Sequence, residues 1–332
     1  MTIEEISKLA NVSKATVSRV LNRNGYVSEE KKKKVLEVLK ETGYQHPEGP
    51  RKPAIGKIHT VGVIISEMTN PYFLSSFEGI AAAADQYDID LIFYNSDRNP
   101  EKEIRALKRF KEMKVQGIII APTLDFDNFE SSKKFSKAMN DTGIPIIFMD
   151  ATAELDQRDG VFFDNFAGAF HAVDSMIQEG HREIGILTGD RNIKAVRDRY
   201  RGYVKALEAN GIKLNQEYIL QGNFTREGAY RITKEYLEKG KLPPAVFTSN
   251  NFSTEGFVRA VLEKNLVLGR DVHCMAFDKL EQFDMFKLKY SYLERNPWEM
   301  GRIAMELLLE RLKNPEILCT RKIIPYHIVI DR

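Results

Sequence analysis

Apolar and polar positions follow two different patterns along the chain, and the change falls near residue 45. Before that point apolar residues recur every three to four positions, which predicts short amphipathic helices. The expected helices run from about residue 3 to 10, from 14 to 22 and from 29 to 40, with Thr2, Ser13 and Ser28 as N-caps. The side chains expected to face inward are Ile6, Leu9, Ala10, Val17, Val20, Leu21, Val35, Leu36 and Leu39.

Residues 46–58 interrupt this pattern. They contain Pro47, Gly49, Pro50, Pro53 and Gly56, a density of proline and glycine that opposes a helix. We therefore expect a linker at 46–58, between a helical head at 1–45 and a core at 59–332.

Beyond residue 59, short apolar runs alternate with helical patterns. The runs are VGVII (61–65), DLIFY (90–94), GIIIA (117–121), PIIFMD (145–150), GVFF (160–163), IGIL (184–187), AVFTS (245–249), VHCMAF (272–277) and a final KIIPYHIVI. Apolar runs separated by helices are typical of parallel sheets covered by helices on both faces. Their number favours an α/β core of two Rossmann-like lobes. The first is expected at about 59–158 plus 292–320 and the second at about 159–290 plus 321–332.

Charge is divided unevenly between the head and the core. The net charge is only +2, yet residues 1–58 hold 12 Lys and Arg against 7 Asp and Glu. A basic head indicates nucleic acid as a partner, although the lysine run 31–34 also fits a solvated helix.

The remaining bulk features restrict the class of protein. Cys274 and Cys319 lack metal-ligand spacing and predict buried, reduced thiols, with neither a disulfide nor a metal site. No apolar run is long enough to cross a membrane, and the start MTIEEISKLA has no secretory pattern. We therefore expect a cytoplasmic protein.

The first two predicted helices are joined by a tight turn, an arrangement that can lay the second helix in the major groove of DNA. The residues that would then meet base edges are Lys14, Ala15 and Thr16, with Arg19 one turn later. The side chains expected to hold phosphates are Ser13, Thr16, Ser18, Asn22 and Tyr26, and Thr2 and Arg51 complete the expected DNA contacts. The periodicity alone also fits a small helical subdomain that does not touch DNA.

The string EEISKLANVSKATVSRVLNRNGYVSEEKKKKVLEVLKETGY resembles the DNA-binding head of the LacI/GalR family of bacterial transcription regulators. The resemblance spans the first 44 residues and includes the segment VSKATVSRVLN. It implies a homodimer that places two heads on a pseudo-palindromic operator of double-stranded DNA.

The linker departs from this family. The resemblance implies a short hinge helix that forms on DNA and wedges a leucine into the minor groove, but Pro53 stands at that position. Ile55 is a candidate substitute, and Arg51, Lys52 and Lys57 could still hold phosphates.

The resemblance continues through the core, in VGVIISEMTNPYF, GHREIGILTGD, DRYRGYVKALEANGI, PPAVFTSNN, MAFDKLE and NPWEMGRIAMELLLERL. It implies a core like that of periplasmic sugar-binding proteins, with two lobes, three crossing strands and a ligand cleft between the lobes. A small effector, a sugar or sugar derivative, is the expected ligand.

Polar residues at strand ends point to the same cleft independently, because ligands of open α/β sheets bind at the carboxyl ends of the strands. Asp150 follows PIIFM, Asn250 and Asn251 follow AVFTS, and Asp278 follows VHCMAF. Carboxylates and amides supply the acceptors and donors that a polyol requires. The resemblance adds Arg199, Tyr72, Phe73 and Phe224 as family ligand contacts, and Trp298 could cover the cleft.

Other roles remain open for some of these residues. Asp278 could cap the next helix, Arg199 could pair with a surface aspartate, and Trp298 could pack against a crossing strand. Two residues also depart from the family. Ala121 stands where some sugar-responsive members have asparagine, and Asn251 stands where the family usually has aspartate. The resemblance therefore does not fix the effector's chemistry.

Two other classes of protein are disfavoured. A transport receptor would need a secretory start and would have no use for the head. A Rossmann-type enzyme would need a phosphate-binding glycine motif or a nucleophile elbow, and neither occurs. We expect no enzyme activity, no cofactor and no metal. No heptad pattern follows the last strand, which favours a dimer, with the helix at 72–87 as an interface element.

Overall fold

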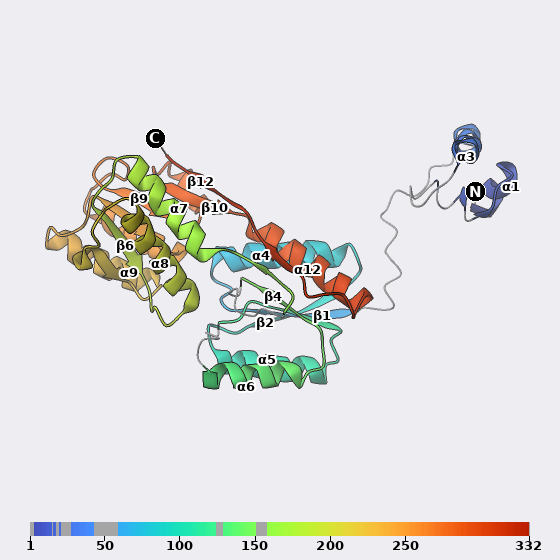
Figure 1. The fold of residues 1–332 in the computed structure, drawn as a ribbon, viewed down its shortest axis with the longest axis horizontal. Coiled ribbons are helices and arrows are strands. Elements are labelled where there is room, and N and C mark those ends of the chain that lie inside the picture. Colours follow the sequence, from blue (N-terminus) through green and yellow to red (C-terminus); the bar gives the residue numbers. More distant parts are fainter. Residues whose placement is uncertain are drawn as a thin grey trace. The chain divides into compact units, whose positions relative to one another are not determined.

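The computed structural model describes residues 3–14, 16–17, 20, 28–42, 59–123, 129–150 and 158–331. The chain forms two compact units, which divide between Pro53 and Ala54 (Figure 1). The first unit contains the helical head and the second contains the α/β core.

The head is built on helix α1 (Ile3–Leu9) and helix α3 (Glu29–Thr42), and Lys14, Thr16, Val17 and Val20 between them are also helical. Its small core consists of Ile6, Ala10, Val17 and Val35, with Val12, Val20 and Val38 packed against them. Leu9 and Leu36 were expected inside and are instead 60% and 50% exposed. Each lies at the flank of its helix's apolar stripe, whose centre is taken by Ile6, Ala10 and Val35. Thr2, Leu21 and the side chain of Leu39 lie outside the described residues.

The core contains two six-stranded sheets, one in each lobe. The first sheet has the order β11-β5-β4-β3-β1-β2 and is parallel throughout. Its strands are β1 (Thr60–Ile65), β2 (Asp90–Asn95), β3 (Gly117–Ile120), β4 (Ile146–Met149), β5 (Gly160–Phe162) and β11 (Arg321–Ile323).

The second sheet has the order β12-β10-β9-β8-β6-β7 and is parallel except for the β10–β12 pair. Its strands are β6 (Ile184–Thr188), β7 (Ile219–Gln221), β8 (Ala245–Thr248), β9 (His273–Ala276), β10 (Ser291–Arg295) and β12 (Tyr326–Val329). The two-lobed α/β core that the sequence predicted is confirmed.

Helices cover both faces of each sheet (Figure 1). In the first lobe α4 (Pro71–Asp85) and α12 (Pro297–Lys313) lie on one face, and α5 (Pro100–Glu112) and α6 (Phe129–Asn140) lie on the other. In the second lobe α7 (Asn165–Gln178) pairs with α8 (Lys194–Ala209), and α9 (Arg226–Glu238) pairs with α10 (Asn251–Glu263). The remaining short elements are η1 (Gln216–Tyr218) and α11 (Glu281–Met285).

The chain passes between the lobes three times, after β5, after β10 and after β11. The sequence predicted that the chain changes lobe at about residues 158, 292 and 320. Strand pairing places β5 and β11 in the first sheet and β10 in the second, so each crossing lies a few residues further along the chain. The final apolar run therefore forms two strands, one in each sheet, with Pro325 between them. The division of the chain into head, linker and core remains a prediction.

Helices α4 and α12 cross at very close range because glycines occupy the contact. A Cβ atom on Gly79 would lie 1.9 Å from the carbonyl oxygen of Trp298, and one on Gly301 would lie 1.8 Å from that of Ser76. The small residues of α4 thus serve packing within the chain. Its expected role in a dimer interface remains a prediction.

Of the two cysteines, Cys274 is buried as expected. Cys319 is exposed, so that prediction is wrong for it. The residue lies in the short segment between α12 and β11, where no apolar layer covers it.

Candidate effector site and DNA-binding head

The ends of the strands bring the predicted cleft residues together between the two lobes. Asp150 directly follows β4 of the first lobe, and Asn250 and Asp278 follow β8 and β9 of the second. Tyr72 lies in the first turn of α4 and Arg199 lies in α8. All five side chains are buried or nearly so.

The backbone is strained at several of these strand ends. Asp97 and Arg98 after β2, Asp150 after β4, and Asn223 and Phe224 after β7 all have φ between +53° and +60°. Non-glycine residues adopt this left-handed conformation at a free-energy cost, and it concentrates at functional sites. Half of the ten non-glycine residues with this conformation in the described part of the chain lie at this edge of the two sheets, which supports a ligand site there.

The centre of the site is Arg295, the last residue of β10. Its Nε donates to Asp278 Oδ1 at 2.6 Å, and its Nη1 lies 3.4 Å from Asp150 Oδ1 in the other lobe. Tyr72 adds a second bond to Asp150, with its hydroxyl donating to Oδ1 at 3.0 Å. One arginine therefore holds a carboxylate from each lobe.

Burial governs the protonation of this cluster. It raises the pKa of Asp150, although Arg295 and Arg199 act in the opposite direction. Burial also opposes the charge on Arg295 and is the largest single effect, but Asp278 and the other acidic groups around it, Tyr72 and Asp150, together outweigh burial and raise the pKa of Arg295. Arg295 therefore stays charged and needs its two acidic partners.

Arg199 approaches the same cluster from α8. Its Nε donates to Asn165 Oδ1 at 2.9 Å and its Nη1 to the carbonyl oxygen of Ser249 at 2.5 Å. Its guanidinium carbon lies 3.6 Å from the centre of the Phe277 ring. Burial, and then the positive charge of Arg295, lower the pKa of Arg199 to about 10. A surface pair with an aspartate is not formed, since Asp198 pairs with Lys194.

The two asparagines at the start of α10 have different roles. Asn250 is the N-cap, and its Oδ1 accepts from the Ser253 amide at 2.8 Å. Asn251 reaches into the other lobe, where its Nδ2 donates to Asn70 Oδ1 at 3.1 Å. Its own Oδ1 is buried and has no hydrogen-bond partner among the described residues. Asn251 thus presents a free acceptor at the junction of the lobes.

The expected aromatic contacts lie around the cluster at different depths. The Phe73 ring packs edge-on against Tyr72, with centroids 5.3 Å apart, and Phe224 is buried 6.0 Å from the Arg199 guanidinium. Trp298 is 39% exposed and lies outside the buried cluster. It lines a pocket of about 790 Å³ together with Tyr72, Asp278 and Arg295.

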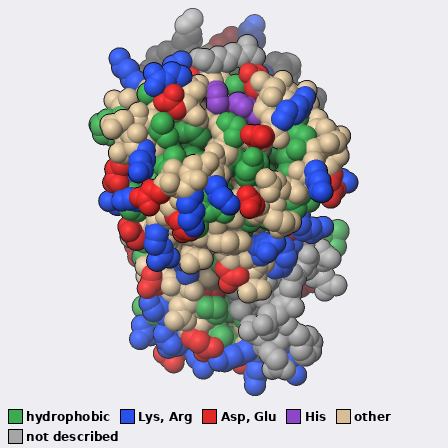
Figure 2. Space-filling model, turned by 90° about the vertical axis from the view of Figure 1, so that its left-hand side faces the viewer, with side chains coloured by type: hydrophobic (Ala, Val, Ile, Leu, Met, Phe, Trp, Pro, Cys, Tyr) green, Lys and Arg blue, Asp and Glu red, His purple; other side chains and the backbone are tan. Residues whose placement is uncertain are grey.

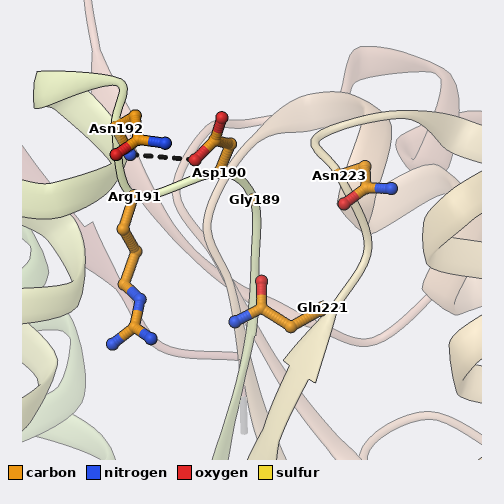
Figure 3. Close-up of a pocket in the computed structure, with 6 residues that line it drawn as sticks. All are labelled: Gly189, Asp190, Arg191, Asn192, Gln221 and Asn223. Carbon is orange, nitrogen blue, oxygen red and sulfur yellow. Dashed lines mark hydrogen bonds between the residues drawn. The ribbon is translucent and has the colours of Figure 1, made fainter.

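A second pocket, of about 700 Å³, opens at the ends of β6 and β7 (Figure 3). Its lining residues are Gly189, Asp190, Arg191, Asn192, Gln221 and Asn223. Asp190 accepts from the Asn192 amide at 2.9 Å, and Gln221 and Asn223 extend into the opening from the β7 side. Gly189 packs against the Phe224 ring, so this pocket adjoins the buried cluster. A carboxylate, a guanidinium and three amides make it a suitable surface for hydroxyl groups.

Sequence reasoning missed Arg295 and the residues of the second pocket. Arg295 lies in SYLER, where Leu293 and Arg295 face the same, buried side of the strand. A charged residue at an inward position of a strand is the signal that could have found it, because buried charges require partners.

In the head, the structure describes three of the expected DNA contacts: Ser13, Lys14 and Thr16. Thr16 donates its backbone amide to Ser13 Oγ at 3.1 Å, the bond of an N-cap at the start of the second helix. Lys14 is exposed on the first turn of that helix. The others, Thr2, Ala15, Ser18, Arg19, Asn22, Tyr26 and Arg51, lie outside the described residues, as do Pro53 and Ile55 of the linker.

The sequence of the head carries an excess of positive charge, but the core surface shows no such excess in the view of Figure 2. There, Lys and Arg are interspersed with Asp and Glu. In the described part of the chain, no helix is both long enough and apolar enough to span a membrane.

These features define a two-lobed ligand-binding core joined to a helix-turn-helix head. Comparison with known proteins agrees. Residues 58–326 match the family described as periplasmic binding proteins and sugar binding domain of LacI family, and residues 2–47 match bacterial regulatory proteins of the lacI family. The chain belongs to the LacI family and is a DNA-binding transcription regulator with a small-molecule-binding core.

Similarity to characterised relatives extends over nearly the whole chain. The transcriptional repressor PurR of Actinobacillus pleuropneumoniae serotype 3 (strain JL03) is 26% identical over 98% of this chain and 95% of its own length. Catabolite control protein A of Priestia megaterium is 28% identical over 96% of this chain and 94% of its own length. These relatives are regulators and not enzymes.

Solved structures confirm the fold. The regulator CelR in complex with cellobiose aligns with a TM-score of 0.71 at 22% identity, covering 100% of this chain and 99% of its own. The lac repressor dimer bound to operator and an anti-inducer aligns with a TM-score of 0.73 at 22% identity, covering 100% and 98%.

Proposed function

We propose that this protein is a transcriptional repressor whose affinity for operator DNA changes when a small, sugar-like effector binds between the lobes of its core. One observation carries the proposal. Polar side chains from both lobes meet at the carboxyl ends of the strands in one buried cluster around Arg295. A ligand in this place touches both lobes and therefore changes how they are held together.

The effector contacts in this proposal are Tyr72, Phe73, Asp150, Arg199, Phe224, Asn250, Asp278 and Trp298, with Arg295 added from the structure. Trp298 contributes from the outer pocket. Asn250 contributes through the second hydrogen of its Nδ2, since its Oδ1 is used as a helix cap and its Nδ2 also donates to the Phe224 carbonyl oxygen at 3.3 Å. The aspartates and amides bind hydroxyl groups, and the aromatic rings cover the apolar side of the ligand.

The DNA contacts in this proposal are Thr2, Ser13, Lys14, Ala15, Thr16, Ser18, Arg19, Asn22, Tyr26 and Arg51. The second helix of the head reads bases through Lys14, Ala15, Thr16 and Arg19. Two copies of the chain bind a two-fold symmetric operator as a homodimer, so each head reads one half-site.

Control follows from the coupling between the two sites. A coupling free energy of about 1–3 kcal/mol changes operator affinity roughly 5- to 150-fold. The effector is bound and released unchanged, and the protein works in the cytoplasm, where its DNA lies.

The test is selection of genomic DNA fragments with the purified full-length chain, followed by binding measurements across a salt series. A two-fold symmetric site bound at least about a thousandfold more tightly than random DNA supports the proposal. Weak binding that ignores sequence and falls steeply with salt contradicts it. Incubation of each bound ligand with the protein should leave the ligand chemically intact.

A further inference from the structure

Two histidines lie side by side at the edge of the second sheet opposite to the cleft. His181 precedes β6 and His273 is the first residue of β9, so both stand where strands begin, whereas the cleft residues follow strand ends. Their ring centres are 4.4 Å apart. The two residues are distant in the sequence and β8 lies between their strands in the sheet, so no spacing motif reveals the pair.

The backbone fixes the position of both residues. Helix α7 ends at Gly180, which has φ of +99°. The His181 amide returns to the Met176 carbonyl oxygen at 3.1 Å, and the Gly180 amide returns to that of Ile177 at 3.0 Å. These two bonds form a Schellman motif, which is a common end of a helix. His273 is held by the pairing of β9 with β8. The two rings therefore meet on ordered backbone.

The nitrogens of the two rings have no partners within the chain. Neither ring forms a hydrogen bond or an ion pair with any residue that the structure describes, although both side chains are partly buried. Burial, and then the adjacent His273, lower the pKa of His181 below its ordinary value of 6.5, against the effect of Glu179. The His181 ring is therefore neutral near pH 7 and keeps a nitrogen lone pair.

The spacing of the rings suits a shared metal ion. Two imidazoles that bind one ion at about 2.0–2.1 Å in adjacent positions place their ring centres about 4.5–5 Å apart. Zn²⁺, Ni²⁺ and Cu²⁺ accept imidazole ligands, whereas Mg²⁺ and Ca²⁺ prefer oxygen. Among the described residues, no group of three or more His, Cys, Asp or Glu side chains could hold a metal ion. The pair is thus an open, two-ligand arrangement with room for water.

We propose that His181 and His273 form a surface site for a divalent transition-metal ion of the zinc, nickel or copper type. The ion bridges the segment after α7 to β9, and water completes its coordination. Cu²⁺ binds most tightly, as the usual order of affinities requires. The site lies at the far edge of the sheet from the cleft, so the inference does not depend on the proposed function.

Metal binding to the full-length chain, prepared without a histidine tag, tests the site. Solutions of NiCl₂ and ZnCl₂ are titrated in a calorimeter near neutral pH, with MgCl₂ as the control for a cation that prefers oxygen. We expect about one tightly bound Ni²⁺ or Zn²⁺ ion per chain and no binding of Mg²⁺ over the same range. The absence of Ni²⁺ and Zn²⁺ binding up to about 1 mM overturns the inference.

Variants assign the bound ion to the pair. His273→Phe keeps an aromatic ring beside His181 and removes one ligand nitrogen, and His181→Gln removes the other. Each should weaken Ni²⁺ and Zn²⁺ binding at least about tenfold, since loss of a partner outside the ligand shell already costs about 10–100-fold. His59→Gln, at an exposed histidine of the first lobe, and Cys319→Ser, at an exposed thiol, are the controls and should leave the affinity unchanged. Affinities within about twofold of wild type in both pair variants mean an adventitious ion only and overturn the inference.

A spectroscopic measurement does not depend on whether these variants fold. Electron spin echoes of Cu²⁺ report the remote nitrogens of bound imidazoles. The measurement uses Cys319→Ser, because an exposed thiol reduces Cu²⁺. We expect the signature of two imidazoles on one ion. A spectrum with one imidazole or none contradicts the proposed site.

Discussion

The guanidinium carbon of Arg295 lies 3.7 Å from the centre of the Tyr72 ring, and this contact joins β10 of the second lobe to α4 of the first. The same side chain pairs with an aspartate from each lobe. Since β10 leads directly into one of the three crossings, Arg295 lies where any movement between the lobes must be accommodated.

Arg295→Met should destabilise the core strongly. It leaves Asp150 and Asp278 buried without a cation, and breaking a buried pair in this way costs about 3–5 kcal/mol. Urea unfolding of the full-length chain measures the loss. Adding Asp150→Asn and Asp278→Asn to the same variant should restore much of it, because the buried negative charges are then removed as well. A loss below about 1 kcal/mol for Arg295→Met alone would show that the cluster is not a buried charge network.

Gly301→Ala should destabilise the first lobe by about 1–3 kcal/mol or more, since the new methyl group meets the Ser76 carbonyl across the α4–α12 contact. Differential scanning calorimetry detects this as a lower Tm. Glu78→Ala, at an exposed position of α4, is the matched control and should stay within about 0.5 kcal/mol of wild type. Equal stability of Gly301→Ala and the control would mean that the helices do not cross as described.

Glu103 makes stability depend on pH. Its side chain is fully buried, and one oxygen, Oε1, accepts from Ser96 Oγ and from both the amide and the hydroxyl of Thr123. Burial raises the pKa of this carboxyl above its ordinary value of 4.5, although the bonds from Thr123 and Ser96 oppose the shift. The protonated form is therefore favoured by folding. Its contribution is fully present below pH 4.5 and is lost as the pH rises through the pKa of the folded state.

Glu103→Gln should flatten this dependence, because the amide keeps the accepting oxygen and does not ionise. Unfolding free energies of wild type should fall with a slope of up to about 1.4 kcal/mol per pH unit relative to the variant as the carboxyl ionises. Glu101→Gln on the same helix is the control, since Glu101 is exposed and pairs with Lys134. Parallel pH profiles for wild type and Glu103→Gln would refute the assignment.

Lys14→Ala should weaken operator binding. If Lys14 reads a base, the loss is about 1–3 kcal/mol and specificity relaxes at one position of each half-site. If it holds a phosphate, the salt slope falls by about one and all sequences are affected alike. Lys239→Ala, which removes one positive charge from the core surface, is the control. Unchanged operator affinity in Lys14→Ala would show that the first turn of the second helix does not face DNA.

Apolar patterning predicted most of the fold because nearly all interior strands, β10 excepted, are buried on both faces. All eight internal runs are strands, within two residues at each end. Two strands were not predicted: β7, which buries only its central residue, and β10, whose sequence SYLER has only two apolar residues followed by two charged ones. The last run was read as one strand because periodicity does not reveal that Ile324 and Pro325 carry the chain from one lobe to the other.

The site was partly predictable because the apolar runs also showed where the strands end. Asp150 and Asp278 stand at the ends of apolar strands, where a polar residue is conspicuous, and the structure brings them to the same buried cluster. The sequence could not show that Arg295 joins them, since that depends on the register of β10 and on where the chain crosses. Nor could it separate Asn250, which caps a helix, from Asn251, which reaches the other lobe.

The central claim is that a ligand in the cleft controls the head, and operator binding by fluorescence anisotropy tests it most directly. The selected operator is titrated with wild type and with Arg199→Gln, each with and without the effector identified by direct binding. The account predicts a change in wild-type operator affinity of roughly 5- to 150-fold and little or no change in the variant. An operator affinity that the bound effector leaves unchanged in wild type, or changes equally in Arg199→Gln, would contradict it.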